Sequence, residues 1–198
     1  TTNIILLPVR NNTGATLTKG TAVYINGALG QNPTVTKAIA TSDATSAQTL
    51  GLVTIDLPNN TVGNVTLIGS LTNINTSAYT DGQQLYLSPT TAGTLTATKP
   101  YAPNHLVYIA VVEHAHPTQG KLFVKVQNGY EMDELHNVSA QSPTSGQTLI
   151  YNATTSLWEK ANLTAGTGIS VSNGAGSITV ANSGVTSAVA GTGISVSS

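Results

Sequence analysis

Short runs of alternating hydrophobic and polar residues fill roughly the first two thirds of the chain, and turn residues separate them. Alternation with a period of two is the pattern of a half-buried strand. The runs that we predict to be strands are residues 4–9, 21–26, 35–40, 50–57, 63–68, 106–113 and 121–127. No window shows a helical period. Regularly spaced short strands favour an all-β domain, either a β-sandwich or a small barrel, over residues 1–128.

Several local features refine this prediction. The dipeptide Asn26-Gly27 is typical of a tight turn, and residues 42–48 read as a polar loop. Residues 83–98 are expected to form a hairpin in which Leu85 and Leu87 share a face. The run 106–113 is the most apolar, which indicates a central strand. In the run that follows, we expect Leu122, Val124 and Val126 to share one face.

Residues 129–162 read as a neck. Residues 132–135 are expected to make one helical turn. Residues 148–151 and 157–160 are predicted to pair as a hairpin, with Leu149, Tyr151, Leu157 and Trp158 as its hydrophobic members. A two-stranded hairpin by itself is marginally stable in water. We therefore expect it to pack on a neighbour, and a second copy of the chain is the favoured one.

Residues 163–198 contain a repeat and read as the start of a shaft. The sequence AGTGISVS occupies residues 165–172 and again 190–197, where the chain stops within a repeat, as expected of a fragment or a processed product. Ile169, Val171, Ile178 and Val180 alternate with Ser or Thr, so each short strand has one narrow apolar face. Such a unit cannot bury that face alone. Stacking of repeats, or three chains around one axis, would cover it.

Composition narrows the function classes. Charged residues make up 8% of the chain and the net charge is −1, so we expect no binding to nucleic acid or to an anionic membrane. So few surface charges suit a chain that is covered by copies of itself or by a large assembly. There is no cysteine, which excludes disulfides and thiolate metal sites. No apolar run approaches the length of a membrane-spanning helix. We expect no cofactor.

The order of these parts resembles the fibre proteins of tailed bacteriophages, especially tail fibres. The neck motif is carried by residues 129–138, GYEMDELHNV, and the hairpin by residues 146–158. The Gly-Thr-Gly-Ile-Ser-Val repeats are residues 166–171 and 191–196. The resemblance implies a homotrimeric, non-enzymatic protein of the virion. One end would be fixed to other virion proteins, and the other would carry a host-receptor-binding tip that lies beyond this chain.

Three alternatives remain beside the tail fibre. Residues 1–128 are loosely similar to β-rich phage modules that include capsid decoration proteins, so a decoration protein or a head fibre is the second interpretation. A tailspike that cleaves polysaccharide would need carboxylates clustered in a groove, whereas the eight acidic residues are scattered. A bacterial adhesin would need an export signal and an anchor. We expect the protein not to be an enzyme.

The candidate metal ligands are His114 and His116. Residues two apart on a strand point to the same face, and three such pairs around a trimer axis would supply six imidazoles. We favour the simpler interpretation of two ordinary histidines at a strand end, because no carboxylate pattern stands nearby to orient them. His105 and His136 show no partner spacing. We therefore predict no metal site.

Two further groups have a functional and a structural interpretation. Glu131, Asp133 and Glu134 are the only acidic cluster, which could be a carboxylate pair or a calcium site. We favour the interpretation that these side chains are solvated or form ion pairs between chains in the neck, because calcium-binding loops need more oxygen ligands at set spacing. Tyr151 and Trp158 could stack on a sugar. We favour a role as cross-strand anchors of the hairpin.

Overall fold

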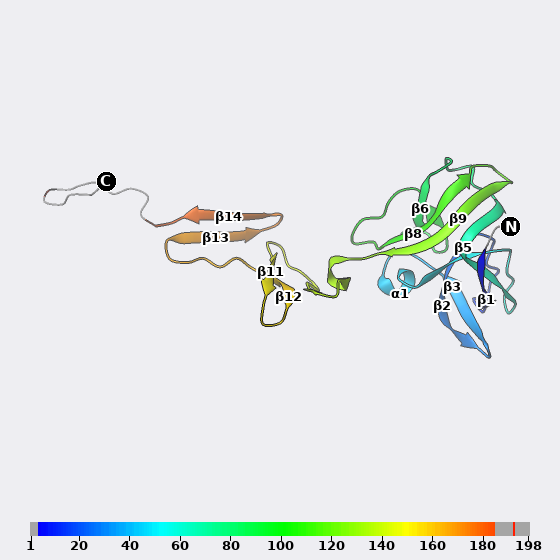
Figure 1. The fold of residues 1–198 in the computed structure, drawn as a ribbon, viewed down its shortest axis with the longest axis horizontal. Coiled ribbons are helices and arrows are strands. Elements are labelled where there is room, and N and C mark those ends of the chain that lie inside the picture. Colours follow the sequence, from blue (N-terminus) through cyan, green and yellow to red (C-terminus); the bar gives the residue numbers. More distant parts are fainter. Residues whose placement is uncertain (1–3, 185–191, 193–198) are drawn as a thin grey trace. The chain divides into compact units, whose positions relative to one another are not determined.

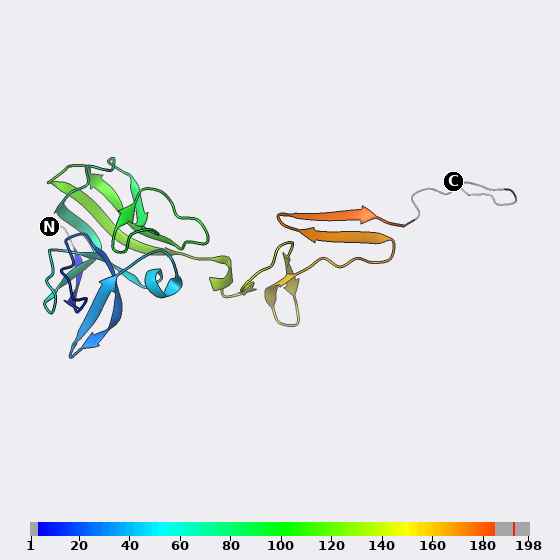
Figure 2. The same cartoon turned by 180° about the vertical axis from the view of Figure 1, so that it is seen from behind.

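The computed structural model describes residues 4–184 and 192. The chain divides into two compact units, the first ending at Gly129 and the second beginning at Tyr130. The regular structure of both units is almost entirely β, so the all-β prediction is confirmed (Figures 1 and 2).

The first unit holds one mixed sheet of nine strands in the order β1-β3-β2-β4-β5-β9-β8-β6-β7. A one-turn helix, α1, lies between β3 and β4. The elements are β1 (Ile5–Asn11), β2 (Ala22–Leu29), β3 (Asn32–Lys37), α1 (Asp43–Ser46), β4 (Thr49–Val53), β5 (Val62–Ile74), β6 (Gln84–Leu87), β7 (Leu95–Thr96), β8 (Leu106–His114) and β9 (Gly120–Gly129).

The first five strands of this order close into a ring. β1 pairs with β3 in parallel and with β5 in antiparallel orientation, so β1-β3-β2-β4-β5 form a small barrel. Because the ring is closed, the side chains that point into it are buried. The barrel core consists of Val9, Leu17, Val23, Val35, Val53, Leu57 and Val65.

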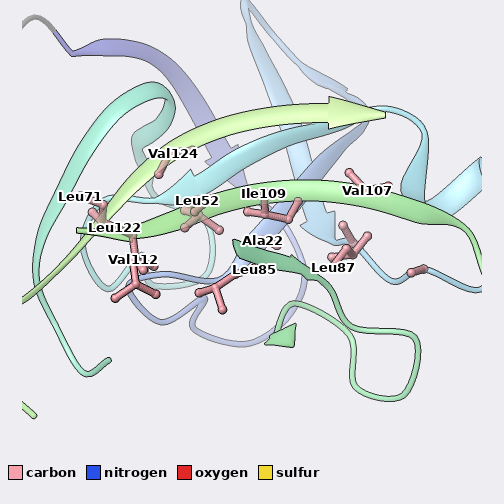
Figure 3. Close-up of a cluster of buried hydrophobic side chains, with 13 residues drawn as sticks. Ala22, Leu52, Leu71, Leu85, Leu87, Val107, Ile109, Val112, Leu122 and Val124 are labelled. Carbon is pink, nitrogen blue, oxygen red and sulfur yellow. The ribbon is translucent and has the colours of Figure 1, made fainter. Parts of the chain in front are cut away.

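β5 is long enough to belong both to the barrel and to the rest of the nine-stranded sheet. Its first half pairs with β1, up to the match of Ile68 with Ile5, and its second half pairs with β9, from Ile68 to Ile74. The sheet then continues through β9, β8, β6 and β7, and its inner face covers a second core (Figure 3). The largest members of this second core are Leu52, Leu71, Leu85, Leu87, Ile109 and Leu122.

The two cores share strands. Ala22 and Val23 are neighbours on β2, yet Ala22 lies in the second core and Val23 in the barrel core. Leu52 and Val53 on β4 are divided in the same way. Since consecutive side chains of a strand point to opposite faces, β2 and β4 separate the two cores and are buried on both sides there.

Several sequence predictions are confirmed. β6 and β7 pair as the expected hairpin, and Leu85 and Leu87 are buried on one face. β8 has a paired strand on each side, as expected of a central strand. On β9, Leu122 and Val124 are buried, whereas Phe123, which lies between them, is exposed.

Other predictions are wrong in detail. Asn26-Gly27 is not a turn: β2 runs on to Leu29, with an irregularity in register between Ile25 and Gly27, and the chain reverses at Gly30, whose φ is 63°. The strand expected over residues 50–57 ends at Val53. The loop expected over residues 42–48 contains α1, which is too short to give a helical period.

The second unit consists of small pieces. A 3₁₀ turn, Met132–Glu134, matches the predicted helical turn. The predicted hairpin forms from β11 (Thr148–Asn152) and β12 (Leu157–Ala161). A third strand, β10 (Val138–Ser139), which was not predicted, pairs with β12 in parallel orientation. A separate two-stranded sheet follows, formed by β13 (Ile169–Gly174) and β14 (Ser177–Asn182).

Candidate functional site: the apolar faces of the second unit

The second unit exposes most of its large hydrophobic side chains. Ala140 is the one buried hydrophobic residue among the described residues of this unit, whereas the first unit has two cores. The exposed side chains, which we call the uncovered apolar set, are Tyr130, Met132, Leu135, Ile150, Tyr151, Trp158, Leu163, Ile169, Ile178 and Val180. Soluble monomers rarely expose apolar side chains at this density, so this unit lacks a core of its own.

The β13–β14 sheet has one apolar face. Val171 lies opposite Val180, and Asn173 lies opposite Ile178. Directly opposed residues of an antiparallel pair point to the same side, and so do residues two apart. Ile169, Val171, Ile178 and Val180 therefore lie on one face of the sheet, which agrees with the prediction of one apolar face for each strand. The other face carries mostly Ser and Thr hydroxyls. The second copy of the repeat, residues 190–197, lies outside the described residues apart from residue 192.

The aromatic pair of the hairpin is formed within the chain. Tyr151 lies opposite Trp158, with ring centroids 5.6 Å apart and ring planes inclined by 57°. This is the tilted geometry of a favourable aromatic contact, which supports the interpretation of the two residues as hairpin anchors. Their side chains are still 51% and 43% exposed. Leu157 is opposite Asn152, so it lies on the other face of the hairpin.

The acidic cluster of the neck makes local backbone contacts. The carboxylate of Glu134 accepts the backbone N–H of Glu131 at 2.6 Å, which caps the 3₁₀ turn. The side chain of Asp133 lies outside the described part of the structure. Within the residues that the structure describes, no group of three or more His, Asp or Glu side chains is arranged to hold a metal ion.

A different carboxylate in this unit has a perturbed pKa. Glu159 accepts a hydrogen bond from the Thr155 hydroxyl at 2.6 Å and one from the Asn152 amide at 3.0 Å. Both bonds favour the charged form, first that from Thr155 and then that from Asn152, and together they lower the pKa of Glu159. This arrangement ties the loop of the hairpin to β12.

His114 and His116 lie side by side, with ring centroids 5.7 Å apart and ring planes inclined by 20°. Nδ1 of His116 accepts the backbone N–H groups of Thr118 at 3.1 Å and Gln119 at 2.9 Å. A neutral imidazole has one acceptor nitrogen, so in this arrangement the proton is on Nε2. His116 thus uses its lone pair to hold the turn before β9, and His114 is exposed.

His105, which shows no partner spacing in the sequence, has a partner in the fold. Its Nδ1 lies 2.9 Å from a carboxylate oxygen of Asp43 in α1. The backbone N–H of His105 also donates to the carbonyl of Ala40. The sequence gives no sign of this contact, because the two partners lie far apart along the chain.

Comparison of the chain with protein-family models and with curated protein sequences finds no match. Among the described residues, no helix is long and apolar enough to cross a membrane.

Proposed function

We propose that this chain is a structural segment of a homotrimeric bacteriophage fibre, with a tail fibre as the leading assignment. The uncovered apolar set of the second unit is the observation that carries the proposal. A chain with such faces gains free energy when copies of itself cover them, at about 25 cal/mol per Å² of apolar surface buried. The Ser and Thr face of β13 and β14 then remains in water.

The two units have different roles in this proposal. The first unit has its own cores and serves as the head, which attaches to other structural proteins at the surface of the virion. The second unit, which includes the repeats, forms the neck and the shaft. Binding to the host cell-surface receptor belongs to a distal part beyond this chain. The protein's role is mechanical, and several fibres together raise the avidity of weak contacts. No catalytic step is involved.

The mass of the chain in solution tests this proposal. One chain has a mass of 20.2 kDa, so light scattering should give about 61 kDa for the full sequence if three chains associate. A chain ending at Gly129 should be a monomer, because it lacks the uncovered apolar set. A trimer of both chains would place assembly in the head as well and favour a decoration protein. A well-folded monomer of the full sequence would contradict the proposal.

A matched pair of variants sharpens this test. Val180→Asp places a charge on the apolar face of β14, and Thr179→Asp places the same charge on the opposite face of the same strand. Both positions are exposed in the single chain. We expect Val180→Asp to reduce the mass and Thr179→Asp to leave it unchanged. Equal behaviour of the two variants would show that the apolar face is not where the chains meet.

A further inference from the structure

The first unit has a surface pocket that the proposed function does not use. It lies between the end of β6, β7 and the loop that leads to β8, and its volume is about 420 Å³. This volume is within the range of roughly 300–1,000 Å³ that is usual for small-molecule sites. The residues that determine its chemistry are Thr90, Thr98, Lys99, Pro100, Tyr101 and Asn104.

One wall of the pocket is an aromatic ring with a cation over one of its two faces. The side chain of Tyr101 is 72% exposed, and Nζ of Lys99 lies 5.5 Å from the centre of its ring. Pro100, between them in sequence, is buried and fixes this part of the loop. None of the described residues that line the pocket is Asp or Glu. The pocket thus combines an aromatic ring with one positive charge that no carboxylate of the lining neutralises.

Several backbone donors near the pocket are already used. The Ser88 hydroxyl accepts the N–H groups of Thr90 at 3.2 Å and Thr91 at 3.1 Å, and the Thr96 hydroxyl accepts the N–H of Thr98 at 3.1 Å. Phosphate and sulfate sites depend on several free N–H donors that converge on the anion. Here several of these donors are engaged, and Lys99 is the one cation among the described residues of the lining, so the lining favours a ligand with a single carboxylate.

We propose that this pocket binds an acidic sugar, a pyranose that carries one carboxylate. Lys99 pairs with the carboxylate. The face of the Tyr101 ring that Lys99 leaves open stacks against the C–H face of the sugar ring, whose weakly positive hydrogens match the negative face of the aromatic ring. The hydroxyls of Thr90 and Thr98 and the amide of Asn104 can both donate and accept, as sugar hydroxyls require. This inference goes beyond the proposed structural function and does not depend on it.

Saturation-transfer NMR with the full 198-residue chain tests the pocket. The probes are methyl glucuronide, methyl glucoside and acetate. We expect methyl glucuronide to bind roughly three- to five-fold more tightly than methyl glucoside, which is the size of the contribution of one exposed ion pair. Acetate should give no measurable binding, because it has no ring to stack. Absence of binding by methyl glucuronide, or equal binding of acetate, would overturn the proposal.

Variants locate the binding on the pocket. Lys99→Met should lower the affinity for methyl glucuronide to that for methyl glucoside, and Tyr101→Ala should abolish binding of both. Lys125→Met and Phe123→Ala, both at exposed positions of β9, are the controls and should bind as the unchanged chain does. If Lys99→Met and Tyr101→Ala bind like the controls, the pocket is not the site. Melting curves confirm that each variant is folded.

Discussion

Replacing Leu85 or Leu17 by alanine tests whether the two cores of the first unit unfold together. Leu85 is fully buried in the second core, and Leu17 is fully buried in the barrel core. A Leu→Ala change in a packed core costs about 2–5 kcal/mol, because the lost transfer free energy adds to the cost of a cavity. We expect about 3 kcal/mol for each variant.

The expected shift in melting temperature follows from the size of the unit. Unfolding entropy is about 2.1 cal/mol/K per residue, which gives roughly 0.26 kcal/mol/K for a unit of about 125 residues. A loss of about 3 kcal/mol therefore lowers the melting temperature by about 11 °C. Because β2, β4 and β5 each contribute side chains to both cores, both variants should shift the same single transition.

Circular dichroism melting of a chain ending at Gly129 measures this effect. Phe123→Ala, on the exposed face of β9, is the control and should lower the melting temperature much less. Two separate transitions, with Leu17→Ala affecting one and Leu85→Ala the other, would refute the reasoning that shared strands join the two cores.

Three other predictions concern single positions. Gly51→Ala should cost roughly 3 kcal/mol or more in a melting experiment, because the added Cβ would overlap the backbone of Thr66, whereas Gly166→Ala meets no neighbouring atom and should be neutral. Thr155→Val should raise the pKa of Glu159 in an NMR titration. Since the pKa of Glu159 is lowered in the folded state, the two hydrogen bonds of its carboxylate stabilise the fold at pH values above the unfolded-state pKa. This stabilisation is lost as the pH falls through the folded-state pKa. Equimolar zinc should leave the ring resonances of His116 unchanged, because its Nδ1 already accepts two N–H groups; a shift would restore the metal hypothesis.

Most strands of the first unit could be predicted because alternation is a local signal. β8 and β9 were found in this way, and so was the hairpin of β6 and β7. The closure of the barrel could not be predicted. It rests on two residue pairs between β1 and β3, Arg10 with Thr34 and Asn11 with Val35, and on a long-range pairing with β5. Local patterns carry no information on such pairings.

The sequence predicted part of the candidate site. The alternation around Val171 and Val180 indicated an apolar face, and the register of β13 with β14 places both residues on it. β10 was missed because two residues are too few to show a period. The pocket beside Tyr101 was missed because its lining comes from a turn, a two-residue strand and a loop, which share no motif. A pocket of this kind is visible only once the chain is folded.

The order of β1, β5 and β9 determines how the first unit carries tension. β1 and β9 flank β5 and are both antiparallel to it, so they run in the same direction. A force applied at the start of β1 and at Gly129, the end of β9, therefore pulls the two outer strands in opposite directions along their axes. The hydrogen bonds of both ladders are then loaded together in shear, rather than one after another as in a strand peeled from its end. The first unit is consequently arranged to resist being pulled apart from its two ends.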